Sequence, residues 1–363
     1  MRIVLVAPPW ISVPPPAYGG TELVIDTLAR GLAAAGHDVV LATTGDSTCP
    51  VERTWTHPRA RTADMGDVAV ELRHVLHAYE QVSGADVVHD HTTAGPLYGA
   101  RRTSLPVVTT NHTLFSDDMR AIYRALDGRV PVIAISHHHA TTARDVPVAR
   151  VIHHGLDLDG IPVGPGGDHL AFVGRMDPSK GVREAIEIAR RADAPLVIAA
   201  KMRSRAERDY FDAQIKPLLG GPIEYAGELD RPAALELLRS ARALLNPIQW
   251  DEPFGLVMVE ALASGTPVIT SPRGAAPEIV DHGTTGFLAA TLEQAVAAVS
   301  WSAGIDRRAC RKAAEARFSA DRMVADHLAL YHDVLAGRLV RAANSRGRDA
   351  VVALPGGVTS LSS

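Results

Sequence analysis

Two glutamates stand eight positions apart in the segment QWDEPFGLVMVEALASGTPV, residues 249–268. Glu252 precedes an almost wholly apolar run and Glu260 lies inside it, so the two would be ~12 Å apart along a continuous helix. That separation is too large for an acid–base pair of carboxylates. It suits the two ends of one extended ligand, with each carboxylate accepting hydrogen bonds from a pair of hydroxyls. A buried Glu260 would be costly without such a partner, although the spacing alone leaves open that Glu260 is simply exposed.

A pair of cations occurs in GRMDPSKG, residues 174–181. Arg175 and Lys180 lie five residues apart around a turn that contains a proline, and such a turn can direct both side chains toward one point. Arginine offers a planar fork for phosphate oxygens, and lysine offers a mobile point charge. The segment therefore predicts a phosphate site, with two solvated surface charges as the alternative.

Gly19 and Gly20 follow the first predicted strand and a proline-rich loop, and they stand at the start of a predicted helix. Backbone N–H groups and the helix dipole at such a position suit an anion. The alternative is that the two glycines only shape the loop.

Histidines form two dense groups. His89 and His91 in the sequence HDH would share one face at the end of a strand, and residues 137–139 are expected to begin a helix and lie at the surface. No third ligand follows at a characteristic spacing and there is no H-E-x-x-H sequence, so neither a structural nor a catalytic metal is predicted. His112 follows another strand and is a candidate for the same ligand site.

Short β-branched runs alternate with helical patterns along most of the chain, which predicts parallel sheets joined by right-handed crossovers. The predicted strands cover residues 3–7, 38–45, 85–91, 106–112, 131–136 and 149–155, then 169–174, 195–201, 223–228, 243–248 and 266–271. Ligands of such sheets bind beyond the carboxyl ends of the strands. All the candidate groups above follow strands in this way.

The alternation breaks once, at a segment rich in glycine, proline and aspartate. The predicted organisation is a Rossmann-like domain over residues 1–155, a linker over 156–167 and a second Rossmann-like domain over 168–317. A helix over 318–336 is expected to return to the first domain. Residues 337–363 lose periodicity and are expected to be a disordered tail.

Composition narrows the classes of function. The 363 residues carry a net charge of −4, which gives no reason to expect nucleic acid as a partner. Cys49 and Cys310 form no disulfide or metal pattern, no signal peptide is visible, and no apolar run reaches the ~18 residues of a membrane span. A cytoplasmic location is expected, with membrane contact at most peripheral.

Taken together and in this order, these motifs resemble those of the retaining glycosyltransferases of family 4, which have the GT-B fold. The resemblance covers most of residues 1–336 and is most specific at FVGRMDPSKGV, similar to the family's G-R-x-x-x-x-K-G element, and at EPFGLVMVEALASGTPVI, similar to its E-x7-E element. AYGGTE, HDHT, TNHT and VIHHGLD support it. Where the family usually has Pro-Asn-Gly, this chain has His153-His154-Gly155. The resemblance implies an α/β, GT-B fold: two Rossmann-like, doubly wound domains that face each other across a deep cleft.

The resemblance also implies a role for each candidate. Arg175 and Lys180 would bind the donor's diphosphate, Glu252 the sugar hydroxyls, Glu260 the ribose, and His112 would sit beside the sugar. The residues implied to be catalytic are His112, Arg175, Lys180 and Glu252. Those implied to bind the donor are Gly19, Gly20, Arg175, Lys180, Met202, Leu229, Glu252, Phe254, Gly255, Leu256 and Glu260.

The implied reaction moves a sugar, of hexosyl type, from a nucleotide-diphosphate sugar to an alcohol acceptor with retention of anomeric configuration. It would use no metal and no cofactor. The acceptor, a saccharide, a lipid-linked sugar or a natural product, is not specified by the sequence. Two alternatives stay open: another GT-B chemistry such as a sugar-nucleotide epimerase, and a degenerate, non-catalytic protein that binds nucleotide sugars.

Overall fold

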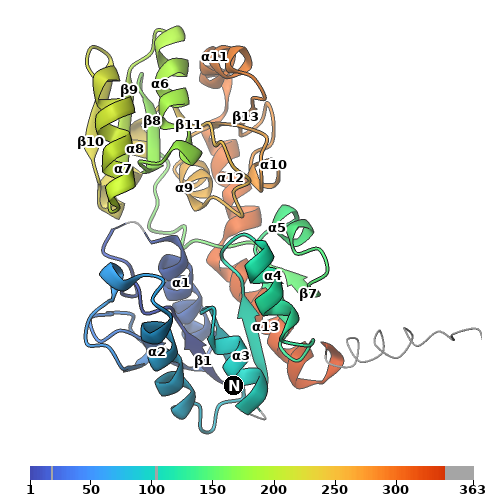
Figure 1. Ribbon diagram of the computed structural model, residues 1–363. Helices are drawn as coiled ribbons and strands as arrows, with labels where there is room; N and C mark the ends of the chain where they lie inside the picture. The colour runs from blue at the N-terminus through green and yellow to red at the C-terminus, as the bar shows by residue number, and fades with distance from the viewer. Residues whose placement is uncertain (18, 103–104, 340–363) are drawn as a thin grey trace, which may run out of the picture.

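A computed structural model of the protein describes residues 1–17, 19–102 and 105–339. Figure 1 shows two α/β domains stacked end to end. Most of the expected tail, from residue 340 onward, lies outside the described residues.

The N-terminal domain is built on a seven-stranded, wholly parallel sheet in the order β3-β2-β1-β4-β5-β6-β7. Its strands are β1 (Arg2–Val6), β2 (Asp38–Thr43), β3 (Glu52–Trp55), β4 (Val87–Asp90), β5 (Val107–Thr110), β6 (Val132–Ala134) and β7 (Val148–Val151). Its helices are α1 (Gly20–Ala34), α2 (Val68–Glu80), α3 (Gly95–Arg102), α4 (Asp117–Arg124) and α5 (His137–Thr142). The strand order reverses between β1 and β4, where a parallel sheet opens a binding crevice.

Side-chain alternation decides which helices cover which face of this sheet. Ile3 and Leu5 of β1 pack with α1 and with a helix from the end of the chain, whereas Val4 and Val6 pack with α2 and α4. Both sets are fully buried, because successive side chains of a strand point to opposite faces. The sheet is therefore covered on both sides, as a parallel sheet requires.

The C-terminal domain repeats this plan with six parallel strands in the order β10-β9-β8-β11-β12-β13. The strands are β8 (Leu170–Arg175), β9 (Leu196–Lys201), β10 (Ile223–Gly227), β11 (Ala243–Asn246), β12 (Val268–Thr270) and β13 (Gly286–Leu288). The helices are α6 (Val182–Arg191), α7 (Arg205–Tyr210), α8 (Arg231–Ser240), α9 (Leu256–Ala263), α10 (Ala276–Ile279), α11 (Leu292–Trp301) and α12 (Arg307–Phe318). One face is covered by α8, α9, α10 and α12 and the other by α6 and α11.

The chain crosses between the domains twice, and the two crossings run side by side. Leu156 N–H donates to Phe318 O at 2.9 Å, and Ala320 N–H donates back to Leu156 O at 2.9 Å. Gly155 fits there because a β-carbon would lie 2.4 Å from Ser319 O. Beyond Ser319, α13 (Ala320–Leu335) packs on α1 in the N-terminal domain, with Met323, Val324 and Tyr331 among the buried contacts. No described helix has the length and apolar character needed to cross a bilayer.

Candidate active site

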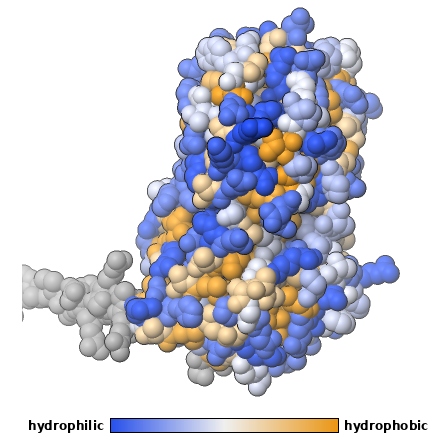
Figure 2. All heavy atoms as spheres, turned by 180° about the vertical axis from the view of Figure 1, so that it is seen from behind, coloured by the Kyte–Doolittle hydropathy of each residue, from blue (hydrophilic) through white to orange (hydrophobic). Residues whose placement is uncertain are grey.

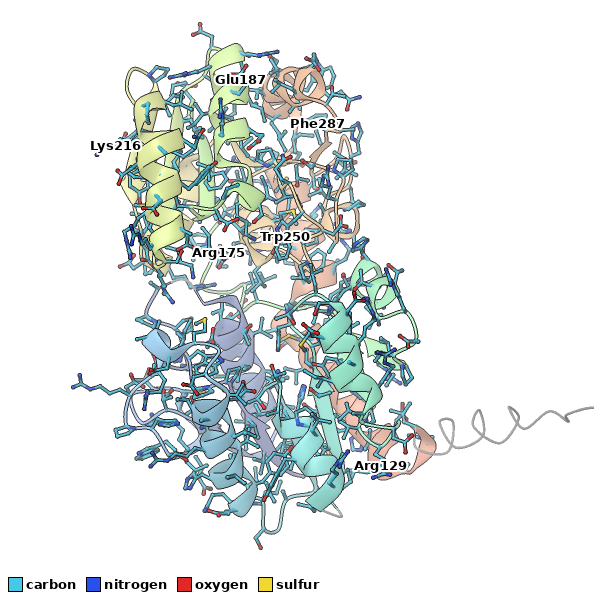
Figure 3. The ribbon with its side chains drawn as sticks, in the orientation of Figure 1. Arg129, Arg175, Glu187, Lys216, Trp250 and Phe287 are labelled. Carbon is cyan, nitrogen blue, oxygen red and sulfur yellow. The ribbon has the colours of Figure 1, made fainter. Side chains whose placement is uncertain are left out.

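A cavity of about 420 Å³ lies between the two domains, at the carboxyl ends of both sheets. Figure 3 shows Arg175 and Trp250 on the edge of the C-terminal domain that faces the N-terminal one. Figure 2 shows the molecule from behind, where the atoms of the two domains form one continuous surface. From the N-terminal domain the lining includes Pro15, Gly19, Gly20, His112 and His154, and from the C-terminal domain Arg175, Lys180, Lys201, Arg231, Trp250, Glu252 and Glu260.

Two helix N-termini, one from each domain, face this cavity. Helix α1 begins at Gly20 and α9 begins after Gly255, and both glycines line the cavity. A β-carbon on Gly20 would lie 3.3 Å from Leu256, so the two helix starts are in close approach. Gly255 has φ +99°, a left-handed conformation that other residues adopt only with strain. Backbone N–H groups at the first turn of a helix point out of its end, so these two helix starts can bind an anion between them.

Lys180 and Glu252 are bonded to each other. The lysine Nζ donates to Glu252 Oε2, and Trp250 Nε1 donates to the same oxygen at 2.9 Å. Lys180 Nζ also lies 5.1 Å from the centre of the Trp250 ring, within reach of a cation–π interaction. Asp177 fixes the preceding turn by accepting from Ser179 N–H at 2.9 Å. The lysine and the carboxylate thus neutralise one another, and an anionic ligand would compete for the lysine.

Glu260 lies beside an arginine, and its side chain is 18% exposed. Arg231, the first residue of α8, places its Nε 3.5 Å from Glu260 Oε1. Burial raises the pKa of Glu260, and the neighbouring guanidinium opposes the rise. Arg231 Nε is itself buried without a hydrogen-bond partner among the described residues. Both residues line the cavity, so Glu260 and Arg231 can still form hydrogen bonds with a ligand there.

A column of buried histidines supports the N-terminal side of the cavity. His112, which lines the cavity, is bonded through Nε2 to His91 Nδ1 at 2.8 Å. The His91 ring lies 4.1 Å from that of His89, which is bonded to Tyr331 of α13 at 2.7 Å. Burial lowers the pKa of His112 to about 3 and holds those of His89 and His91 well below the ordinary value. The imidazole at the cavity wall is therefore neutral at physiological pH.

The cavity brings together eleven of the twelve residues proposed for the site: Gly19, Gly20, His112, Arg175, Lys180, Leu229, Glu252, Phe254, Gly255, Leu256 and Glu260. Met202 is not among the lining residues and packs, partly buried, against the core next to β9. Its neighbour Lys201 lines the cavity instead.

Sequence reasoning missed Trp250 and Arg231 at the site and left the role of His154 open. Trp250 and Arg231 contact the two glutamates, and His154 stacks on His112 at 5.2 Å between ring centres. The cost of a buried Glu260 was a signal that a cation should be near it, but nothing in the spacing pointed to Arg231.

Comparison with known proteins agrees with this geometry. The model of "Glycosyltransferase Family 4" matches residues 18–159, and that of "Glycosyl transferases group 1" matches residues 164–315. The two matched ranges correspond to the N-terminal and C-terminal domains, and residues of both ranges line the cavity. The chain belongs to the family 4 glycosyltransferases. The fold is therefore GT-B, and the expected fold class is confirmed.

Relatives of this glycosyltransferase span nearly its whole length. The glycogen synthase of Mycobacterium tuberculosis (strain CDC 1551 / Oshkosh) is 28% identical, over 90% of this chain and 91% of that protein. The crystal structure of AviGT4, a glycosyltransferase involved in avilamycin A biosynthesis, is 26% identical, with a TM-score of 0.68 over 93% of this chain and 98% of that one. Anabaena Alr3699/HepE in complex with UDP and glucose has a TM-score of 0.69 at 21% identity, over 91% and 99%.

Proposed function

We propose that this glycosyltransferase moves a hexosyl group from a nucleotide-diphosphate sugar to a hydroxyl acceptor with retention of configuration. The observation that carries the proposal is the clustering of Arg175, Lys180 and two helix N-termini around one cavity. Four sources of positive charge from both domains suit a diphosphate. A structural neighbour that holds UDP supports the same choice of ligand.

The two glutamates then bind opposite ends of the donor. Glu252, beside Lys180 and the start of α9, is positioned to accept from sugar hydroxyls. Glu260 lies deeper along α9, where a ribose diol would donate to its carboxylate and offset the cost of its burial. In this assignment Glu252 and Glu260 are far apart because they bind the sugar and the ribose, which are at opposite ends of the donor.

Charge at the leaving group is stabilised by the protein in this mechanism. As the bond from the anomeric carbon to the phosphate oxygen breaks, negative charge grows on the diphosphate, where Arg175 and Lys180 strengthen their interaction. The acceptor oxygen bonds to the anomeric carbon on the face from which the phosphate departs, and the phosphate accepts the hydroxyl proton, which gives retention. His112, neutral and backed by His91, positions the sugar through hydrogen bonding. In this proposal these cations serve the diphosphate without a divalent ion.

A calorimetric titration with UDP, GDP, ADP and dTDP, each with and without EDTA, tests this proposal. We expect one nucleotide to bind with clear preference and with an affinity that EDTA leaves unchanged. Binding that EDTA abolishes would overturn the metal-free clamp, and the absence of any binding would favour the non-catalytic alternative.

Replacement of Glu260 by glutamine should remove discrimination at the ribose. The wild-type protein should bind its nucleoside diphosphate about 10–100-fold more tightly than the 2′,3′-dideoxy analogue, since a hydrogen bond to a charged group contributes about 1.5–3 kcal/mol. Glu260→Gln should bind both with similar, weak affinity, measured by calorimetry. Lys180→Ala is the matched control and should retain the preference for the ribose. If Glu260→Gln still discriminates fully, the ribose lies elsewhere.

A further inference from the structure

Three potential metal ligands converge outside the cavity, on the seam between the domains. His137 begins α5, His153 follows β7, and Glu278 lies on α10 of the C-terminal domain. One ligand atom from each lies within 4.8 Å of the other two. None of the three lines the active-site cavity. The prediction from sequence found no third ligand near residues 137–139 because the other two lie 16 and 141 positions away.

The carboxylate at the centre of this group is rigidly held. Glu278 Oε1 accepts from His138 N–H at 2.7 Å, and Oε2 accepts from His137 N–H at 2.9 Å. These bonds come from the backbone, so they would persist with a metal on the carboxylate. Secondary hydrogen bonds of this kind orient ligating carboxylates in metal sites. The residue whose N–H holds Glu278 also supplies an imidazole to the group.

The second imidazole is already in contact with the carboxylate. His153 Nε2 lies 2.7 Å from Glu278 Oε2, and the two side chains are only 23% and 18% exposed. The His153 ring packs edge-on against Phe318 at 6.0 Å between ring centres and lies 5.9 Å from Phe254. His137 approaches the same ring edge-on at 5.6 Å. One ligand is thus fixed by aromatic packing, while His137 is at the surface and open to solvent.

We propose that His137, His153 and Glu278 bind a zinc ion that bridges the two domains. Two imidazole nitrogens and one carboxylate oxygen form a known zinc ligand set, with water as the fourth ligand in a tetrahedral arrangement. At zinc–ligand distances of ~2.0 Å, the donor atoms of a tetrahedron are about 3.3 Å apart. His153 Nε2 and Glu278 Oε2, now 2.7 Å apart, need to separate by about 0.6 Å to reach that distance. The ion replaces the proton between them, so His153 binds it as a neutral ring protonated on Nδ1.

The ion would fasten the arrangement of the domains. His137 and His153 come from the N-terminal domain and Glu278 from the C-terminal one, so movement that separates the domains at this seam would break metal bonds. A ligand that binds only this arrangement stabilises it by mass action. The zinc site would be separate from the nucleotide site, and zinc would bind without a nucleotide.

A calorimetric titration of the EDTA-treated, metal-free protein with zinc tests the proposal. Cobalt provides a second reading, because a tetrahedral site gives it visible absorption. We expect one ion per chain, at least tenfold weaker binding in His137→Ala, and loss of the cobalt absorption in His153→Ala. His332→Ala, which replaces another exposed histidine, should bind as the wild type does. Lys180→Ala should also bind zinc normally, which separates this site from the nucleotide site.

His137→Ala removes only an exposed side chain and leaves the backbone N–H that holds Glu278. Its circular dichroism and melting temperature in EDTA should therefore match those of the wild type. No binding of zinc to the wild type, or equal affinity in His137→Ala and the wild type, would overturn the proposal.

Discussion

Lys180→Ala is expected to reduce kcat/KM for sugar transfer by about 100–1,000-fold, since removal of one group that stabilises developing charge has effects of this size. Lys180 is 9% exposed, lines the cavity and is bonded to Glu252. In the proposed mechanism it releases the carboxylate to bind the diphosphate, whose charge increases as the glycosidic bond breaks. Initial rates of nucleotide release from the preferred donor, with acceptor present, measure the effect.

The effect of Lys180→Ala on catalysis can be separated from its effect on folding. Loss of the lysine leaves Glu252 partly buried, with Trp250 as its remaining side-chain partner among the described residues, so the variant should also melt at a lower temperature. Adding Glu252→Gln to the variant should restore melting without restoring transfer. Lys216→Ala, at an exposed lysine of the same domain (Figure 3), should leave both unchanged. Unchanged nucleotide affinity and transfer in Lys180→Ala would place the diphosphate elsewhere.

The protein is also expected to lose stability, by several kcal/mol, as the pH falls from 7 to 5.5. Burial lowers the pKa of His74, His139 and His327 to about 4 and of His112 to about 3, and holds that of three more histidines well below the ordinary value: His89, His91 and His154. Below their unfolded pKa of about 6.5, these rings bind protons only in the unfolded chain. Each therefore contributes stability that is present above pH 6.5 and is lost as the pH falls, on the order of 1 kcal/mol over this interval.

Two buried carboxyls oppose this loss. Burial raises the pKa of Glu22 and of Asp90 to about 7, so the folded state binds their protons first and gains about 3 kcal/mol over the same interval. The seven histidines outnumber the two carboxyls, so the loss of stability dominates. A loss of this size is comparable with the whole stability of many domains.

Thermal melting at pH 7.5, 6.5 and 5.5 measures this dependence. His74→Gln should lessen the loss by about 1 kcal/mol, because the folded-state partner of His74 is a single backbone oxygen, Ala7 O, at 2.8 Å. His332→Ala, exposed in the folded protein, should melt in parallel with the wild type. Equal melting temperatures at pH 7.5 and 5.5 would show that the buried rings accept protons in the folded state.

The parts of the site that depend on short sequence motifs could be predicted from the sequence. The turn around Arg175 and Lys180 and the start of α9 after Gly255 depend on neighbours within a few residues. Strands β3 and β13 were not predicted: each is an edge strand, β13 has only three residues, and every residue of β3 is at least partly exposed. Neither carries the continuous apolar run that marked the central strands.

Contacts between residues far apart in the sequence could not be predicted from local sequence patterns. Lys180 and Glu252 are 72 positions apart, and His89 and Tyr331 are 242 apart, so no local period links them. The expectation that residues 137–139 lie at the surface was wrong for His139, which is fully buried. Ser136 caps α5, a helix of six residues, by accepting from His139 N–H. The His139 side chain points inward, and its ring contacts Ile135 N–H and Thr113 O. So short a helix shows no amphipathic period to read.

The return of α13 to the N-terminal domain has a consequence for how the protein is made. Residues 1–155 supply all seven strands of the first sheet and helix α1 on one of its faces. The rest of the cover on that face, and Tyr331 as the partner of His89, come only with residues 320–335. On the ribosome, the second domain emerges as a continuous segment and can fold before the first is complete. The domain synthesised first is therefore finished last, and a fragment that ends near residue 155 should expose apolar surface and aggregate.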